Sequence, residues 1–457
     1  MVRVTSVSRS HGLLVREGTP PPGSLPDSPL GSMTVGGYFE QWLQELLRAS
    51  PPGDAPIPVF IVAAEGGGLR AAYWTATVLA ELEDGTSHSP TPFSRHLFAV
   101  SGVSGGSVGA VLFDAMVAMR AGGTVTGSVG AVQSRRAEME QLLAADYLSD
   151  ALGNALFPDL LQRFLPMPIF SDRAVALERL FEYAWSALHP RDPLQLSAAF
   201  HDLWRTSPHG VPLLFLNSTV VETGQRAINY PLATHAADPV FADSFAVGRF
   251  IGTALPLSTA ALLSARFTYV SPAGLIDTRR AAEPRWIRLV DGGYFDNSGA
   301  VTAEEVARSL LQARDSSRMR LIVLHLPNEA QVASADLNEE QRSFSRLEFL
   351  SEIFAPIQAL LNTRSARGTQ AVSHLRTEPG LELLSIGPCR VHVSAPLGWV
   401  LSREVRHDMS HQLTRCDGVG AHCAAERLQW VEELLNGKSD TPYPPDLTRP
   451  PQCSATQ

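Results

Sequence analysis

A Gly-Val-Ser-Gly-Gly segment beginning at Gly102 lies between a short apolar run and a helical pattern. Residues 97–100 are uniformly apolar, which predicts a buried strand, and residues 108–119 repeat apolar side chains at helical spacing. Gly102 and Gly106 flank Ser104 as a strained strand-to-helix turn requires, because a side chain there would strike the neighbouring elements. Such a turn exposes the Ser104 hydroxyl near the positive end of a helix, where developing negative charge is stabilised. The alternative is a glycine-rich junction without chemistry.

A second glycine cluster, Gly66–Gly68, follows a strand predicted over residues 57–64 and precedes a helix predicted over residues 71–82. Three glycines at a helix start leave their N–H groups unobstructed, which is typical of an oxyanion hole or a phosphate cradle. A Walker loop needs Gly-Lys-Ser/Thr, and a dinucleotide fingerprint needs a third spaced glycine where Ala71 stands. The cluster therefore favours an oxyanion hole.

A third motif, Asp291-Gly292-Gly293, ends a strand predicted over residues 286–290. An aspartate at a strand end, followed by two glycines, can direct its carboxylate into a cleft without obstruction. The alternative is an ordinary Asp-Gly turn.

Taken in order, the three motifs resemble the patatin-like phospholipase family, and bacterial patatin-like proteins carry similar segments. Residues 264–274 and 396–402 add to the resemblance, which spans residues 55 to 405. Ala71 departs from the family pattern, whose loop usually closes with glycine. The resemblance implies a three-layer α/β/α hydrolase with a mostly parallel central sheet.

The resemblance also implies a serine–aspartate dyad, in which Ser104 is the nucleophile and Asp291 accepts its proton directly. An aspartate with an ordinary pKa near 4 is a weak base, so burial must raise the pKa of Asp291. Backbone N–H groups of Gly66–Gly68 would hold the oxyanion. Arg70 either adds positive charge beside this loop or braces its turn. The two turns would be supported by five glycines, Gly102, Gly105, Gly106, Gly292 and Gly293.

The expected reaction is hydrolysis of a lipid carboxylic ester through an acyl-serine intermediate, as in a phospholipase A or lysophospholipase, without cofactor or metal. One alternative is an α/β-hydrolase with a full triad, whose histidine would follow Asp291 in the chain. His325, at the end of the apolar run 321–324, is the first candidate for it. The other alternative is a catalytically silent lipid-binding scaffold.

The charge and apolar content of the chain limit the kinds of partner that it can bind. The chain has 457 residues, a formal net charge of −9 and 44% apolar residues, which suits a large globular core and disfavours nucleic acid as a partner. We expect a lipid substrate and allow contact with a membrane surface, and the oligomeric state stays open. No transmembrane segment or secretory signal is visible, so we expect a cytoplasmic or peripheral membrane protein.

The predicted organisation is a flexible arm over residues 1–34, a catalytic domain over 35–437 and a proline-rich tail over 438–457. Within the domain, the core motifs occupy residues 57–300 and a helical insertion occupies about 121–210. Further elements are expected as helices at 35–47, 131–148, 172–188 and 347–361 and as a strand at 213–221. The apolar stretch 157–170 is expected to be core, with a loop that contacts acyl chains as the alternative.

Four cysteines lie late in the chain: Cys389, Cys416, Cys423 and Cys453. Cys416 and Cys423 could close a small disulfide loop in an oxidising compartment, but we expect unpaired thiols in a reducing cytoplasm. Zinc binding with His411 and His422 is not expected, because the spacing matches no common ligand pattern.

Overall fold

The computed structural model is described over most of the chain. The described residues are 30–50, 55–121, 134–149, 153, 172–192, 194–205, 207–232, 238–250, 255–267, 271–277, 286–329, 348–389, 398–416 and 423–437. The apolar stretch 157–170, most of the arm and the proline-rich tail lie outside them. Leu30 falls within the arm that the sequence predicted to be flexible, but it is 1% exposed and belongs to the core.

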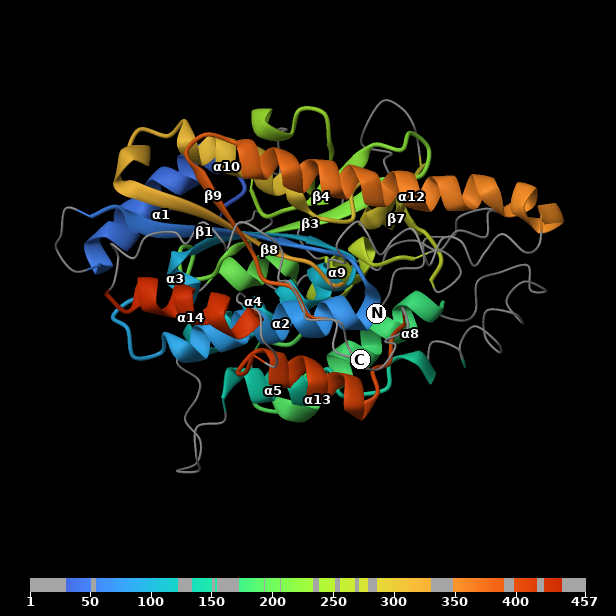
Figure 1. Ribbon diagram of the computed structural model, residues 1–457, viewed down its shortest axis with the longest axis horizontal. Coiled ribbons are helices and arrows are strands. Elements are labelled where there is room, and N and C mark those ends of the chain that lie inside the picture. The colour runs from blue at the N-terminus through green and yellow to red at the C-terminus, as the bar shows by residue number, and fades with distance from the viewer. Residues whose placement is uncertain are drawn as a thin grey trace.

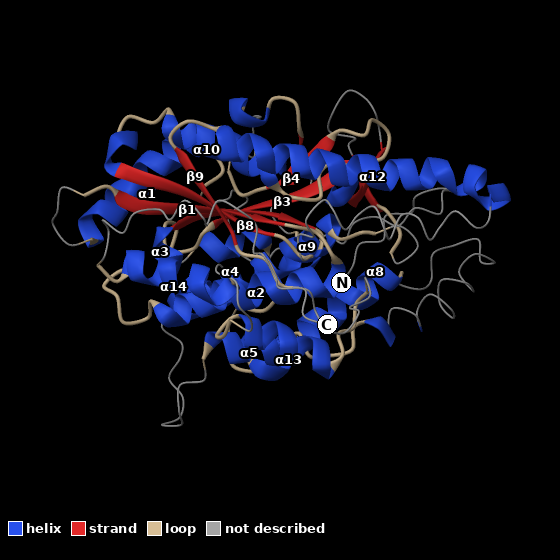
Figure 2. Ribbon diagram, in the orientation of Figure 1, coloured by secondary structure: helices blue, strands red, loops and turns tan. Residues whose placement is uncertain are grey.

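A nine-stranded sheet forms the centre of the molecule (Figures 1 and 2), with the main strand order β5-β4-β3-β2-β1-β8-β9. The strands are β1 Ile57–Ala64, β2 Leu97–Val103, β3 Leu213–Val220, β4 Arg226–Asn229, β5 Phe245–Ala246, β6 Gly274–Asp277, β7 Trp286–Asp291, β8 Met319–Leu326 and β9 Leu381–Ser385. Strand β7 pairs with β3 and β6 outside the main path. Five of the pairings are parallel and three are antiparallel, which confirms the mostly parallel sheet.

Helices cover both faces of the sheet, as Figure 1 shows: α1, α10 and α12 lie on one side, and α2, α4, α5, α13 and α14 lie on the other. The helices are α1 Val35–Ala49, α2 Gly68–Gly85, α3 Phe93–His96, α4 Gly105–Ala121, α5 Arg135–Leu142, α8 Arg173–Leu188, α9 Leu257–Ser264, α10 Ala300–Leu311, α12 Glu348–Thr377, α13 Arg403–Gln412 and α14 Ala424–Leu435. The expected three-layer α/β/α architecture is thus confirmed.

The central strands are largely apolar because helices bury both of their faces. Strand β1 is buried from Pro58 to Ala64 and pairs in parallel with β2 and β8. Its last residue, Ala64, lies opposite Gly102 of β2 and Leu326 of β8. The loops that follow these three strands therefore meet at one edge of the sheet.

Strand β7 brings the aspartate motif to the same edge from the opposite direction. On β3, Asn217 pairs in parallel with Val103, and the next residue, Ser218, pairs in antiparallel fashion with Asp291. The end of β7 therefore lies beside the end of β2, although the two strands are far apart in sequence.

Most predicted elements are confirmed, and two differ in length. The helix expected over residues 131–148 is α5, which ends at Leu142, because Asp146 accepts the N–H groups of Leu148 and Ser149 and starts a new turn. The helix expected at 347–361 continues as α12 to Thr377. Its added turns bury only a narrow face that includes Ala371, Val372 and Leu375, and the prediction stopped before this sparse apolar stripe.

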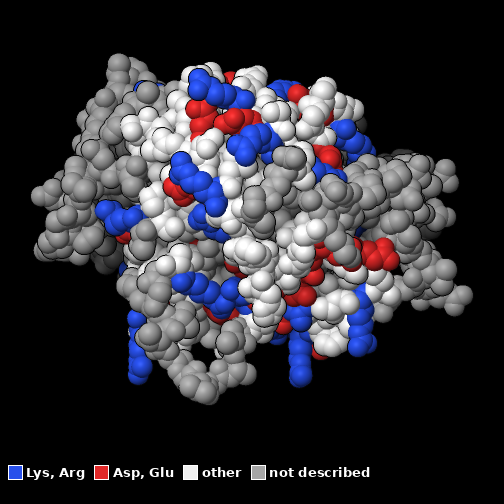
Figure 3. Space-filling view, turned by 90° about the vertical axis from the view of Figure 1, so that its left-hand side faces the viewer, with Lys and Arg blue, Asp and Glu red and all other residues white. Residues whose placement is uncertain are grey.

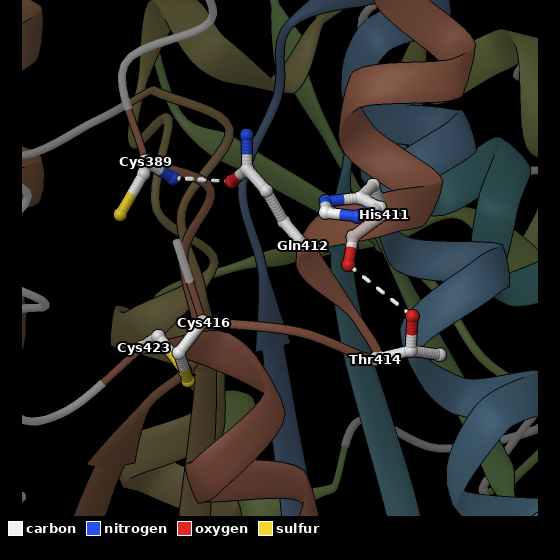
Figure 4. Close-up of a disulfide and its surroundings, with 6 residues drawn as sticks. All are labelled: Cys389, His411, Gln412, Thr414, Cys416 and Cys423. Carbon is white, nitrogen blue, oxygen red and sulfur yellow. Dashed lines mark hydrogen bonds between the residues drawn. A yellow bond between two sulfur atoms is a disulfide. The ribbon is translucent and has the colours of Figure 1, made fainter. Parts of the chain in front are cut away.

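The expectation of unpaired thiols is wrong. Cys416 and Cys423 form a disulfide with Cα atoms 5.6 Å apart, and Cys389 is also disulfide-bonded, to a partner outside the described residues. The disulfide links the segment that follows α13, which ends at Gln412, to the N-cap of α14, which is Cys423 (Figure 4). The Cys389 N–H donates to Gln412 at 2.7 Å in the same region. Sulfur atoms in a disulfide are not thiolate ligands, so the zinc interpretation fails for this pair.

The surface carries interspersed charges. On the face in Figure 3, cationic and anionic side chains lie side by side over the described residues. None of the described helices combines the length and apolar character that a bilayer crossing needs.

Candidate active site

Ser104 occupies a strained turn between β2 and α4. Its φ of 52° makes it the only described residue other than glycine with a positive φ. An L side chain adopts this conformation at an energetic cost, which the surrounding structure must offset. The side chain is 7% exposed, and helix α4 begins at the next residue. The predicted strand–turn–helix around this serine is confirmed.

A buried hydrogen-bond network holds the turn. The N–H of Ser104 donates to the Ser264 hydroxyl at 3.0 Å, and Ser107 donates to the same hydroxyl at 2.8 Å. Ser264 in turn donates to the carbonyl of Asn217, whose side-chain amide donates to the Gly102 carbonyl at 2.9 Å. These contacts compensate for the strain at Ser104. Sequence reasoning assigned no role to Asn217, which carries no motif of its own.

Glycines allow the close packing around this turn. A Cβ on Gly105 would collide with the Gly68 carbonyl, and one on Gly106 would lie 2.6 Å from the Ala64 carbonyl. A Cβ on Gly102 would lie 2.7 Å from the backbone of Ser107. The turn and the Gly66–Gly68 loop are therefore in direct backbone contact.

Asp291 ends β7 and is 1% exposed. Its Oδ1 accepts the Gly293 N–H at 2.8 Å, while Oδ2 has no hydrogen-bond partner of ordinary geometry. Burial raises the pKa of Asp291, and the neighbouring Ser104 hydroxyl, the Gly293 N–H and the charge of Arg364 oppose that rise. The structure thus places the Ser104 hydroxyl beside the Asp291 carboxylate.

Gly292 and Gly293 keep this turn compact. A Cβ on Gly292 would collide with the Asn217 carbonyl, and one on Gly293 would lie 3.1 Å from Cζ of Arg364. Both glycines are buried. They therefore let the aspartate turn approach β3 and α12 closely.

The glycine loop lies beside Ser104, since a Cβ built on Gly66 would be 3.1 Å from Cβ of Ser104. The N–H of Gly66 donates to the Asn297 carbonyl at 2.9 Å. It is therefore not available to a substrate, contrary to the expectation for this glycine. The N–H groups of Gly67 and Gly68, at the start of α2, have no partner among the described residues.

Two asparagines contact the same loop, and sequence reasoning gave neither a role. The Gly66 carbonyl accepts Nδ2 of Asn297 at 3.2 Å and also accepts Nδ2 of Asn328. Asn328 follows the end of β8, and a polar residue just beyond a parallel strand was a usable signal. Asn297 lies six positions after the motif aspartate, where nothing distinguished it from a turn residue.

The guanidinium of Arg70 is held by contacts with Asn328 and Glu329 and does not point freely into the site. Its guanidinium donates to Oδ1 of Asn328 at 2.6 Å and pairs with Glu329 at 2.7 Å. Of the two roles considered for Arg70, these contacts support bracing of the loop. A second arginine, Arg364 of α12, donates to Oδ1 of Asn297 at 2.8 Å.

His325 does not complete a triad. It is 1% exposed, and its Nε2 lies 3.0 Å from Glu65 while its Nδ1 lies 3.2 Å from the Ser385 hydroxyl. Both ring nitrogens are therefore occupied by groups other than Ser104 and Asp291. This arrangement opposes the α/β-hydrolase alternative for this histidine.

Apolar side chains of α4, α8 and α9 meet one turn beyond Ser104. They enclose a cavity of about 10 Å³ between Val108, Phe181 and Leu262. A space of this size holds no acyl chain unless the surrounding side chains move. Phe267, 37% exposed, stacks on Tyr294 with ring centroids 6.2 Å apart near the aspartate turn.

Comparison with known proteins assigns no family to the chain. No protein family and no curated protein matches the chain. Among solved structures, human GIVD cytosolic phospholipase A2 is similar with a TM-score of 0.36 and 12% identity, over 67% of this chain and 50% of that one. The same human enzyme in complex with methyl gamma-linolenyl fluorophosphonate is similar with a TM-score of 0.36 and 16% identity, over 89% of this chain and 61% of that one. A further complex of that enzyme, which also contains terbium chloride, is similar with a TM-score of 0.34 and 16% identity.

This chain therefore spans about half to three fifths of the length of those structures. A similarity this weak says nothing about the site residues. Membership of the patatin-like family stays a prediction.

Proposed function

We propose that the chain is a serine hydrolase of lipid carboxylic esters, with Ser104 as nucleophile and Asp291 as general base. The observation that carries the proposal is the meeting of a strained serine and a buried carboxylate beside the N–H groups of Gly67 and Gly68, which have no partner among the described residues. Nucleophile, proton acceptor and oxyanion donors are the parts that acyl transfer requires. In the part of the chain that the structure describes, no other serine combines a positive φ with a carboxylate neighbour.

The first half-reaction forms an acyl-enzyme. The Ser104 hydroxyl transfers its proton to Asp291 as its oxygen attacks the carbonyl carbon of the ester. The N–H groups of Gly67 and Gly68 bind the resulting oxyanion. When the intermediate collapses, the alcohol leaves with the proton from Asp291, and the acyl group stays on Ser104.

The second half-reaction uses water in place of the serine. Asp291 takes a proton from the water, whose oxygen attacks the acyl carbon, and returns that proton to Ser104 as the carboxylic acid departs. Burial supports this role, because a raised pKa makes the Asp291 carboxylate a stronger base than an exposed aspartate.

A lipid as the acyl donor is supported by the apolar side chains that α4, α8 and α9 bring together one turn beyond Ser104, which would receive an acyl chain only after moving apart, and by the exposed Phe267. The test is to incubate purified protein with defined phospholipids, lysophospholipids and acylglycerols and to identify released acids by mass spectrometry. Ser104→Ala should release none. Ser373→Ala, which changes an exposed serine on α12, should match the wild type. Lipid binding without release by the wild type would favour a silent scaffold.

A further inference from the structure

The peptide between Gly66 and Gly67 is held by its carbonyl oxygen. Two side-chain amides, from Asn297 and Asn328, donate to that single oxygen from loops on either side. A trans peptide keeps its C=O and N–H on opposite sides of one rigid plane. Fixing the carbonyl therefore also fixes the direction of the Gly67 N–H.

The orientation of each amide is itself determined by an arginine. Arg364 donates to Oδ1 of Asn297 at 2.8 Å, and Arg70 donates to Oδ1 of Asn328 at 2.6 Å. A guanidinium has donors and no acceptor, so each arginine must face the amide oxygen. The amide nitrogen is then left to face the Gly66 carbonyl. We call Asn297 and Asn328 the asparagine clamp.

From this geometry we infer that the asparagine clamp positions the oxyanion hole, by holding the Gly66–Gly67 peptide so that the Gly67 N–H faces the reacting carbonyl. The inference depends on the proposed function, since it assigns residues to the same site. A flipped peptide would present the Gly66 carbonyl there instead, and its partial negative charge would repel the oxyanion. Asn297 and Asn328 act through the peptide and are positioning residues rather than catalytic ones.

Polarisation of the Gly66–Gly67 peptide also strengthens the oxyanion hole. A peptide whose carbonyl accepts hydrogen bonds is polarised, and its N–H becomes a stronger donor. The neighbouring peptide is also fixed, because the Gly66 N–H donates to the Asn297 carbonyl at 2.9 Å. Asn297 therefore holds the loop through both its backbone and its side chain.

The test compares Asn297→Ala and Asn328→Ala with a matched control, Asn436→Ala. Asn436 also donates its Nδ2 to a glycine carbonyl, that of Gly85, at 3.4 Å, but at the exposed end of α14. On p-nitrophenyl butyrate, we expect each clamp variant to lose about 100-fold in kcat, the size of a lost oxyanion donor. KM should change by less than about 3-fold, because the interaction develops in the transition state. The control should match the wild type.

Active-site titration with a fluorophosphonate separates positioning from folding. If the clamp positions the peptide, each variant should label slowly but reach the same final stoichiometry as the wild type. Clamp variants as fast as Asn436→Ala would overturn the inference, and so would a final stoichiometry reduced in proportion to kcat. If the wild type neither labels nor hydrolyses ester, the proposed function itself has failed.

Discussion

Gly66 and Asn297 bind each other through two hydrogen bonds, one from the glycine N–H to the asparagine carbonyl and one from the asparagine amide to the glycine carbonyl. Gly66 belongs to the loop after β1, and Asn297 belongs to the loop that carries Asp291. The pair therefore joins the oxyanion loop to the base loop. A shift in either loop would strain these two hydrogen bonds, so the pair couples the position of the oxyanion loop to that of the base loop.

The pH dependence of activity reports on Asp291. Its carboxylate must be ionised to accept a proton, and burial raises its pKa, so kcat/KM should fall on the acid side above the ordinary aspartate value of about 3.9. Asp291→Asn should lose about 10²- to 10⁴-fold in kcat. Steady-state kinetics across pH would check both expectations. An acid limb that persists unchanged in Asp291→Asn would identify a different base.

Gly105→Ala should abolish activity, because its Cβ would collide with the Gly68 carbonyl and separate the elbow from the oxyanion loop. Gly36→Ala is the control, since its Cβ would meet nothing closer than 3.7 Å and alanine favours the helix α1. Hydrolysis of p-nitrophenyl butyrate and thermal unfolding should be measured for both. Full activity in Gly105→Ala would show that this backbone contact is not needed.

Asp114 should make the fold less stable as pH rises. It is fully buried in α4, neither carboxylate oxygen has a hydrogen-bond partner, and burial raises its pKa well above the ordinary value. Above a pH of about 4 the unfolded chain ionises this group while the folded chain keeps it protonated, so stability falls as pH rises. Asp114→Asn should flatten this fall. A melting temperature with the same pH slope in both proteins would contradict the expectation.

The Cys416–Cys423 disulfide should stabilise the fold without affecting catalysis. In the chain-entropy account, closing so short a loop contributes about 2 kcal/mol. The Cys416→Ser/Cys423→Ser double variant should lose up to that amount in denaturant unfolding and keep its kcat. Peptide mapping without reduction should recover the two cysteines as one linked species.

Sequence predicted the strands that are buried on both faces, because β1, β2 and β3 each contain a run of apolar residues, although β2 and β3 also carry small or polar residues towards their ends. It missed short or edge strands such as β4 and β9, which lack such a run. The glycine motifs located the turns, since only glycine fits where Gly105 meets Gly68.

The asparagine clamp was not predictable in the same way. Its contacts join residues more than two hundred positions apart, and which end of each amide faces the glycine depends on Arg70 and Arg364. Sequence likewise overstated the availability of the Gly66 N–H, because its acceptor, the Asn297 carbonyl, is set by the packing of two loops.

The most direct test of the account is to label the wild-type protein with a fluorophosphonate and to identify the modified residue by peptide mass spectrometry. We predict one label per chain, on Ser104, with no labelling of Ser104→Ala and strongly slowed labelling of Asp291→Asn. Equal labelling of Ser104→Ala and the wild type, or a label on another residue, would contradict the assignment of Ser104 as nucleophile.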